Sequence, residues 1–302
     1  IFPKLSWIHI KVQDFIMGIF MRKCDICISL TGYVYAPRIA QKKGAIIIME
    51  RGSKHILEQK KILEKNPHKK NEAIPNRNIK CDLKAYQFAN FISVASQHVK
   101  ESFLLHQYPE NRIFVNPYGV DLSMFKPLPN IPKKYDVIMV GGWGYEKGCD
   151  LIVEAIRKTN YSFIHVGSIK DVDFPQEKNF THIDPVDQSK LIEYYNQAKV
   201  FILPSRQDGF GMVLSQALAC NLPIIGSNNC GAPDLKKMVE LPEYITIIKD
   251  YTADAIVTAI HTAIKNYEQL GERIYAGNAI ENLTWEAYGK RYANFLHKII
   301  KQ

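Results

Sequence analysis

Short apolar runs alternate along this chain with segments in which apolar residues recur at helical spacing. Unbroken runs, such as residues 45–49 and 200–203, are typical of strands that are buried on both faces of a parallel sheet. Strands are predicted at residues 24–30, 45–49, 91–94, 112–115, 135–142, 162–167, 180–186, 200–203, 222–227 and 244–249. Helices are predicted at residues 36–43, 54–64, 80–89, 97–106, 149–158, 187–198, 212–220, 253–270 and 285–300. This alternation predicts the α/β class, with two doubly wound, Rossmann-like domains that face each other across a ligand cleft.

The most informative stretch is residues 199–220, which has the order strand, glycine loop, helix. A polar turn leads from the apolar run to Gly-Phe-Gly at residues 209–211, and helical spacing begins at Met212. Free N–H groups and the positive end of the helix dipole then lie at the carboxyl edge of the sheet, where an anion is expected. Asp208 lies at the loop rim, and Gln216 lies about two turns down the helix. A generic βα unit without a ligand is the alternative.

A second glycine turn follows the predicted strand at residues 135–142. Gly141 and Gly142 end this strand, and Lys147 precedes the next helix. A glycine turn that opens a helix can cradle a phosphate, although the signal is weak by itself. The alternative for Lys147 is a solvent-facing lysine in a turn.

These stretches resemble the retaining glycosyltransferases of family 4, the group 1 glycosyl transferases, which have the GT-B fold. The family motif is Pro-Ser-x-x-Glu-Gly-Phe-Gly followed by Glu-Ala-Met-Ala, and here Asp208 and Gln216 replace the two glutamates. The resemblance implies that Asp208 faces hydroxyls of the donor sugar and that Gln216 contacts the ribose, whose hydroxyls an amide can bind. It also implies that Lys147 neutralises the donor diphosphate. Gly142 stands where the family carries a second cation, an arginine.

The resemblance implies further site residues. Donor contacts are expected from Gly141, Gly142, Gly167, Pro185, Val186, Gly209, Phe210, Gly211, Met212, Val213 and Gln216. Asp208, Lys147 and Arg51 form the expected catalytic set. Arg51 stands where many family members carry a histidine that contacts the sugar, and its charge suits a phosphate or an acceptor carboxylate. A surface arginine at a strand end is the alternative, and His55, one helical turn on, is a second candidate for that place.

A proline-broken basic linker at residues 128–134 predicts the domain boundary. We expect an acceptor-side domain at residues 1–128, a nucleotide-sugar-binding domain at residues 129–284, and a helix at residues 285–302 that crosses back to the first domain. Thr284 is predicted to cap that helix. Family first domains begin with further strands and a glycine-rich loop. This first domain is therefore expected to be a fragment or a shortened form, unless residues 1–20 substitute for part of that region of strands and loop.

The positive charge is uneven along the 302 residues. Residues 1–130 hold 20 basic and 10 acidic residues, a net +10, and the rest hold 19 and 20, a net −1, which together give +9. The excess is densest at residues 51–84, with ten basic and four acidic side chains. This region favours an anionic membrane surface or a phosphate-linked acceptor, with a solvated face as the equal alternative. Nucleic acid is not expected, because no RNA-binding motif or recognition-helix pattern accompanies the charge.

The chain shows neither a run of about 18 apolar residues nor, in residues 1–20, the apolar core of a secretion signal. Cys24 and Cys27 have metal-ligand spacing without a second pair, so buried thiols are expected rather than zinc. The six cysteines fit a reducing compartment. We expect a cytoplasmic protein, with peripheral contact at the inner membrane face.

The predicted function is retaining transfer of a hexose from a nucleotide diphosphate sugar to a glycan or lipid-linked acceptor, in polysaccharide or cell-envelope biosynthesis. A non-catalytic subunit that binds a nucleotide sugar and a GT-B nucleotide-sugar epimerase are the alternatives. No cofactor and no metal are expected, because the Asp-x-Asp sequence at residues 171–173 is expected in a loop away from the glycine turns. His165 and His182 lie in apolar strands and are expected to be packed core residues.

Overall fold

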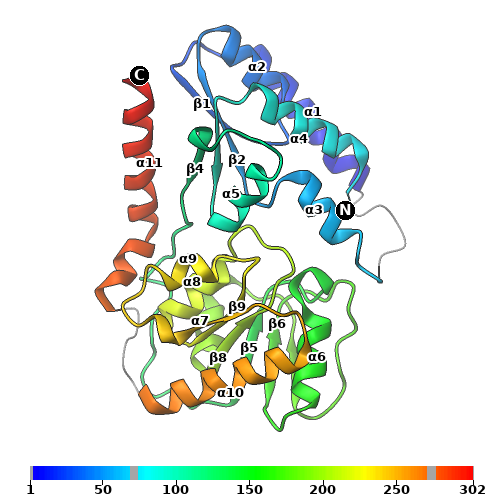
Figure 1. Ribbon diagram of the computed structural model, residues 1–302, viewed down its shortest axis with the longest axis vertical. Coiled ribbons are helices and arrows are strands. Elements are labelled where there is room, and N and C mark those ends of the chain that lie inside the picture. The colour runs from blue at the N-terminus through cyan, green and yellow to red at the C-terminus, as the bar shows by residue number, and fades with distance from the viewer. Residues whose placement is uncertain (1–2, 69–73, 271–276, 302) are drawn as a thin grey trace.

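The described residues form two separate parallel sheets, and the helix nearest the carboxyl end runs beside the first of them (Figure 1). This computed structural model describes residues 3–68, 74–270 and 277–301. The predicted α/β class is confirmed, and each predicted helix and strand is present with its ends shifted by a few residues. The bounds 1–128, 129–284 and 285–302 of the three regions stay predictions.

Within the described residues, the first sheet has the strand order β1-β2-β3-β4, with all pairs parallel. Its strands are β1 (Ile26–Leu30), β2 (Ile46–Arg51), β3 (Phe91–Val94) and β4 (Ile113–Val115). Its helices are α1 (Pro3–Ile19), α2 (Tyr35–Lys42), α3 (Ile56–Leu63), α4 (Asn76–Phe88) and α5 (Gln97–Leu104), with the 3₁₀ turn η1 (Glu110–Arg112).

The second sheet has the order β10-β9-β8-β5-β6-β7 among the described residues. Its strands are β5 (Tyr135–Val140), β6 (Phe163–Val166), β7 (Phe180–Ile183), β8 (Ala198–Leu203), β9 (Ile224–Ser227) and β10 (Ile245–Ile248). The other elements are η2 (Tyr145–Lys147), α6 (Cys149–Arg157), α7 (Gln188–Asn196), α8 (Met212–Ala219), α9 (Ala232–Lys236), η3 (Pro242–Tyr244), α10 (Ala253–Leu270), η4 (Gly277–Leu283) and α11 (Trp285–Ile300). The chain first builds outwards from β5 to β7 and then returns with β8 on the other side of β5. The strand order therefore reverses between β5 and β8.

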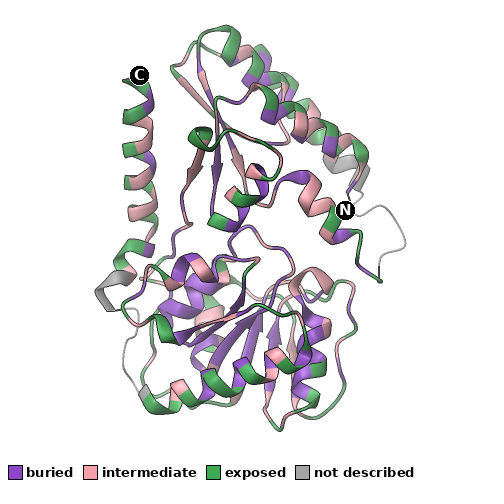
Figure 2. Ribbon diagram, viewed as in Figure 1, coloured by how far each residue is buried: buried purple, intermediate pink, exposed green. Residues whose placement is uncertain are grey.

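The central strand β8 shows why an unbroken apolar run forms this element. All of its residues except Lys199 are buried, because helices cover both faces of the sheet. Figure 2 shows the same burial along most of the second sheet. The largest apolar core surrounds this sheet, and it gives the loops at the carboxyl ends of β5 and β8 a rigid base.

The helix α11 packs on the first sheet. The Phe295 ring stacks on the Phe114 ring, with centroids 4.1 Å apart, and Tyr292 meets Phe114 edge-on. Thr284 Oγ1 accepts a hydrogen bond from the N–H of Ala287 at 3.1 Å, which confirms the predicted cap.

The helix α1 was not predicted from the apolar pattern. Asp14 fixes it to the start of α2, because its carboxylate accepts hydrogen bonds from the N–H groups of Val34, Tyr35 and Ala36 at 2.8–2.9 Å. A carboxylate at a helix amino-terminus satisfies donors that the helix itself leaves free. The predicted polar loop at residues 66–78 ends earlier than expected, where α4 begins, and residues 69–73 lie outside the described residues.

Within the described ranges, no helix has both the length and the apolar character that crossing a bilayer requires. All six cysteines are free thiols, and Cys149, Cys220 and Cys230 are buried.

Candidate active site

A cavity of about 280 Å³ lies where the strand order of the second sheet reverses. The loops that follow β5 and β8 supply most of its wall, and such a reversal is where ligands bind in doubly wound sheets. Gly52 and Tyr118 belong to the first part of the chain, which contains the first sheet and precedes the linker at residues 128–134. The cavity therefore lies between the two sheets. The lining residues are Gly52, Tyr118, Val140, Gly141, Lys147, Leu203, Asp208, Phe210, Gly211, Met212 and Val213.

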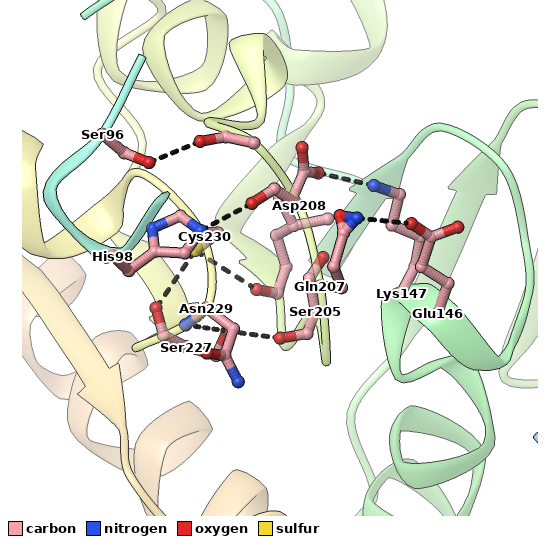
Figure 3. Close-up of polar contacts among 12 residues, drawn as sticks. Ser96, His98, Glu146, Lys147, Ser205, Gln207, Asp208, Ser227, Asn229 and Cys230 are labelled. Carbon is pink, nitrogen blue, oxygen red and sulfur yellow. Dashed lines mark hydrogen bonds and ion pairs between the residues drawn. The ribbon is translucent and has the colours of Figure 1, made fainter. Parts of the chain in front are cut away.

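Lys147 and Asp208 meet in this cavity (Figure 3). Lys147 Nζ donates to Asp208 Oδ2 at 2.6 Å, and the two side chains are 22% and 17% exposed. Burial by itself would lower the pKa of Lys147, but the charge and the hydrogen bond of Asp208 outweigh burial, so the pKa is raised. Lys147 is therefore a cation that is held beside the carboxylate. Two of the three expected catalytic residues are brought together across 61 positions of sequence.

Arg206 fastens the loop of Lys147 to the loop of Asp208. Its guanidinium donates to both carboxylate oxygens of Asp150, at 2.6 and 2.7 Å, and lies 3.8 Å from the centroid of the Tyr145 ring. The backbone N–H of Arg206 also donates to the carbonyl of residue 146 at 2.9 Å. Sequence reasoning missed Arg206, because its partners are far away in the chain.

The helix α8 begins directly at the cavity. Gly211 precedes it with a φ of +79°, a left-handed conformation that favours glycine. Met212 and Val213 open the helix and line the cavity, and the first N–H groups of a helix have no partner within it. These groups and the helix dipole favour an anion next to Lys147.

The glycines that end β5 and β6 lie against each other. A Cβ on Gly167, whose φ is +148°, would lie 2.0 Å from the carbonyl oxygen of Gly141. His165 Nε2 donates to the same carbonyl at 2.8 Å. Burial lowers the pKa of His165 to about 4, so the ring is neutral near pH 7. His165 is fully buried, as expected for a core residue, and His182 stacks on it.

Gly142 is covered by the side chain of Lys170. A Cβ on Gly142 would lie 2.3 Å from Lys170 Cε and 2.7 Å from Lys170 Nζ. The N–H of Lys170 donates to the carbonyl of Trp143 at 2.9 Å, which holds the lysine beside the turn. A cation from the loop after β6 thus lies next to the position where the family has its arginine. Nothing in the sequence singled out Lys170.

The cavity contains part of the expected donor-binding set. The members that line it are Gly141, Phe210, Gly211, Met212 and Val213. The members that do not line it are Gly142, Gly167, Pro185, Val186, Gly209 and Gln216. Gln216 is buried and accepts a hydrogen bond from the Tyr195 hydroxyl at 3.0 Å. Pro185 and Val186 follow β7 at the outer edge of the sheet. The role of each of these residues stays a prediction.

Arg51 lies in a different cavity, of about 430 Å³, which residues of α1, α3 and α4 help to line. Its guanidinium pairs with Asp82 at 2.7 Å and donates to Gln59 at 2.6 Å and to the carbonyl of Lys54 at 3.1 Å. Burial raises the pKa of Asp82 to about 6, although the charge of Arg51 opposes the shift. The structure therefore does not bring Arg51 to the cavity of Lys147 and Asp208.

His55 is also remote from that cavity. Its buried ring stacks on His106 with centroids 4.0 Å apart. Burial, followed by the charge of His106, lowers the pKa of His55 to about 3. Its ring contacts are with residues of the first part of the chain.

The prediction that the Asp-x-Asp sequence lies away from the glycine turns is wrong. Asp171 Oδ1 accepts a hydrogen bond from the N–H of Tyr145 at 2.8 Å, and Oδ2 accepts one from the Asn66 amide at 2.8 Å. A backbone bridge between Trp143 and Ile169 carries this loop to the turn. No group of three or more metal-ligating side chains gathers in the part of the chain that the structure describes.

Several solved structures share this architecture at low sequence identity. A sucrose-phosphate synthase from Thermosynechococcus elongatus has a TM-score of 0.73 at 16% identity, covering 100% of this chain and 80% of that chain. Anabaena HepE, in complex with UDP and glucose, has a TM-score of 0.71 at 13% identity, covering 95% of this chain and 80% of that chain. The two sheets, the cavity between them and these likenesses define the fold as GT-B, as predicted.

The family profile described as "Glycosyl transferases group 1" matches residues 123–279. The chain therefore belongs to the group 1 glycosyl transferases. A probable sucrose-phosphate synthase of Thermosipho melanesiensis is 26% identical over 248 residues, which are 73% of this chain and 57% of the relative. The GDP-mannose-dependent alpha-(1-6)-phosphatidylinositol monomannoside mannosyltransferase of Mycolicibacterium smegmatis is 23% identical over 242 residues, 69% of this chain and 62% of the relative. The chain thus spans less than two thirds of the length of these relatives.

Proposed function

We propose that this protein is a retaining glycosyltransferase that moves a hexose from a nucleotide diphosphate sugar to a glycan or lipid-linked acceptor in polysaccharide or cell-envelope biosynthesis. One observation carries the proposal: Lys147, Asp208 and the start of α8 converge on one cavity between the sheets. The donor class is supported by HepE, which holds UDP and glucose. The acceptor class is supported by the mannosyltransferase, whose name specifies a phosphatidylinositol mannoside.

The proposed diphosphate lies between Lys147 and the first N–H groups of α8. A leaving diphosphate gains negative charge in the transition state, and pre-oriented cations and helix dipoles stabilise such charge without reorganisation. Lys170 lies beside the glycine turn after β5 and adds a second cation. These groups perform the task for which other enzymes use a divalent metal, so we propose metal-independent transfer without a cofactor.

The proposed hexose lies against Asp208. The acceptor hydroxyl forms the new bond to the anomeric carbon on the face from which the diphosphate leaves, and the bond from that carbon to the phosphate oxygen breaks. The acceptor proton passes to the leaving phosphate oxygen, so the chain needs no dedicated base. In this scheme Asp208 orients the sugar and stabilises its developing positive charge.

The test is a panel of UDP-glucose, UDP-N-acetylglucosamine, GDP-mannose and ADP-glucose, each assayed for binding and for release of the nucleoside diphosphate. We expect release from at least one donor, and the same rate in the presence of a chelator. Binding of a donor without turnover of any donor would favour the non-catalytic subunit. An epimerised nucleotide sugar as the product would favour the epimerase, although the residues that line the cavity include no histidine or glutamate.

We also propose a cytoplasmic location, with the first part of the chain contacting an anionic membrane surface. One face of α1 leaves about half of each of several apolar side chains exposed, namely Ile8, Val12, Phe15, Ile16 and Ile19. Beside it, a hollow of about 440 Å³ is lined by the cations Lys11, Arg38, Lys80 and Lys84. An apolar stripe flanked by cations is typical of contact with anionic lipid. Sedimentation with vesicles of phosphatidylcholine, with and without phosphatidylglycerol, tests this: we expect binding only to the anionic vesicles, and equal binding to both kinds would contradict it.

A further inference from the structure

The turn that carries Asp208 is held from both sides of the cleft (Figure 3). The carboxylate of Asp208 points towards Lys147, whereas the backbone carbonyl of the same residue points the opposite way, towards His98. One side of this turn therefore belongs to the cavity and the other belongs to the contact between the two parts of the chain.

Two side chains that follow β3 hold the turn through its carbonyl groups. Ser96 Oγ donates to the carbonyl of Gly209 at 2.5 Å, and His98 Nε2 lies 2.7 Å from the carbonyl oxygen of Asp208. Ser96 is 0% exposed and His98 is 8% exposed, so water competes little for either bond. These two bonds join segments that are 113 and 110 positions apart in sequence.

Within the part of the chain that the structure describes, the ring of His98 makes a single hydrogen bond, to the carbonyl of Asp208. A carbonyl oxygen only accepts hydrogen bonds, so Nε2 must carry the proton. Burial lowers the pKa of His98 to about 4, and the ring is therefore neutral near pH 7, with a lone pair on Nδ1. Nδ1 is buried without a partner among the described residues, so the one polar contact of the ring is with the turn.

The rest of the turn is equally constrained. The N–H of Asp208 donates to the carbonyl of Asn229 at 2.9 Å within the second part of the chain. On the other side, a Cβ on Gly209 would lie 1.8 Å from the carbonyl oxygen of Gly52, so only glycine permits this approach. The peptide groups of Asp208 are thus tied to one sheet through the N–H and to the other through the C=O.

We propose that Ser96 and His98 are positioning residues for Asp208. They hold its turn from the acceptor side, so that the carboxylate is placed for the donor sugar only while the two parts of the chain lie together. The diphosphate subsite does not share this dependence, because Lys147 and α8 belong to the second part. The consequence for sugar transfer rests on the proposed function, whereas the holding of the turn does not.

The kinetic test compares His98→Phe and Ser96→Ala with the rescue variant His98→Gln. Since misplacing a reacting group by about 1 Å costs roughly 10²-fold, we expect kcat to fall at least about tenfold in the first two variants. The Kd of the nucleoside diphosphate should not rise, because Lys147 and α8 keep their places. It should fall by no more than the about 3- to 10-fold that is expected when Asp208 no longer competes for Lys147. His98→Gln can still present an amide N–H to the carbonyl and should recover kcat to within about threefold of the wild type.

The matched control is Ser102→Ala in the same helix. Ser102 is 2% exposed, donates to the carbonyl of Val99 at 2.6 Å and accepts from the N–H of His55 at 2.8 Å, and both partners belong to the first part of the chain. We expect this variant to keep the wild-type kcat. An equal loss of kcat in Ser102→Ala, or a parallel loss of nucleoside diphosphate binding in His98→Phe, would show a general folding role and overturn the proposal.

Hydrogen exchange of the segment at residues 205–212 supplies a readout that needs no activity. Loss of a hydrogen bond lowers the free energy of local opening, so we expect several-fold faster exchange in His98→Phe and Ser96→Ala. The exchange rates in Ser102→Ala should equal those of the wild type. If the wild type released no nucleoside diphosphate from any donor, the proposed function would fail. The exchange measurement would still show whether Ser96 and His98 hold the turn that carries Asp208. Unchanged exchange, or faster exchange with an unchanged kcat in an active enzyme, would overturn the proposal.

Discussion

Removing Lys147 and removing Asp208 should change the affinity for nucleoside diphosphates in opposite directions. The two side chains share one hydrogen bond of 2.6 Å in the cavity. Lys147 is the cation that a diphosphate would meet there, and Asp208 is the anion that already competes for it. Lys147→Met keeps the length of the side chain and removes the charge, and Asp208→Asn keeps the shape and removes the competing charge.

The size of the first effect follows from the kind of contact. A hydrogen bond to a charged group contributes about 1.5–3 kcal/mol, and about 1.4 kcal/mol is a factor of ten in an equilibrium constant. Lys147→Met should therefore raise the Kd of UDP, GDP or ADP by about 10- to 150-fold. Because the pKa of Lys147 is raised above the ordinary value of lysine, the wild-type side chain is charged in a binding assay near neutral pH.

The second effect has the opposite sign and is smaller. At an effective dielectric constant of about 20, two unit charges about 4 Å apart interact by about 4 kcal/mol. The side chains of Lys147 and Asp208 are 22% and 17% exposed, so solvent and salt screen this pair further. An asparagine still accepts a hydrogen bond from Lys147, so only part of this interaction is released. We expect Asp208→Asn to tighten binding of the diphosphate by about 3- to 10-fold while turnover of the sugar donor falls by about 10²-fold or more.

Isothermal titration calorimetry of the three nucleoside diphosphates measures both shifts, and a matched ion pair supplies the control. Lys199 pairs with Asp136 at 2.8 Å, with side chains 32% and 20% exposed, and neither residue lines the cavity. Lys199→Met should leave every Kd unchanged. An unaltered Kd in Lys147→Met, or weaker binding in Asp208→Asn, would refute the assignment of Lys147 to the diphosphate.

Three further predictions concern other parts of the molecule. Lys170→Ala should raise the KM of the sugar donor by about 3- to 10-fold, as expected for one partly screened cation. Adding Gly142→Arg to that variant should restore the wild-type KM. A KM that does not recover would contradict the proposal that Lys170 acts through its charge. Gly209→Ala should lower the free energy of unfolding by about 1–3 kcal/mol, because the new Cβ would lie 1.8 Å from the carbonyl oxygen of Gly52 across the cleft. Thermal unfolding measures this change. An unchanged unfolding transition would show that the two parts of the chain do not touch there. The pKa of His55 is lowered to about 3, so between pH 6.5 and about 3 the unfolded chain binds a proton that the folded chain does not, and the free energy of unfolding decreases as the pH falls. In urea titrations, His55→Phe should reduce this pH dependence by about 1.4 kcal/mol per pH unit. The same pH dependence in His55→Phe and in the wild type would contradict the lowered pKa of His55.

The place where Lys147 and Asp208 meet, the proposed diphosphate subsite, could be predicted from sequence because each half of it is local. The stretch at residues 199–220 contains a buried strand, its loop and the helix that starts at the cavity. Residues 135–157 repeat this order with β5, a glycine turn and α6. Parallel strands end at one edge of the sheet, so two such local units place Lys147 and Asp208 together once β5 and β8 are neighbours.

The contacts between the two parts of the chain could not be predicted in this way. Neither Ser96 nor His98 belongs to a motif that carries chemistry, and their partners lie more than 100 positions away. The same holds for Lys170, whose place beside Gly142 depends on how the loop after β6 pairs with the turn after β5. Side chains of this kind are found only when the geometry of both segments is known.

Arg51 shows how strand register decides which residue can reach the cleft. It is still a paired residue of β2, opposite Val94, and side chains alternate along a strand, so it shares the face of Met49 and points into the helical layer with Asp82. Along β2, the residues that reach the loops of the second sheet come after this last paired position. Gly52 does so with its backbone, and Lys54 does so with its side chain, which donates to Asn229 Oδ1 at 2.7 Å. Burial lowers the pKa of Lys54 against the pull of nearby carboxylates, as expected for an ammonium group enclosed between two sheets. The cation that the end of β2 directs across the cleft is therefore Lys54, three positions after the arginine that the family resemblance suggested.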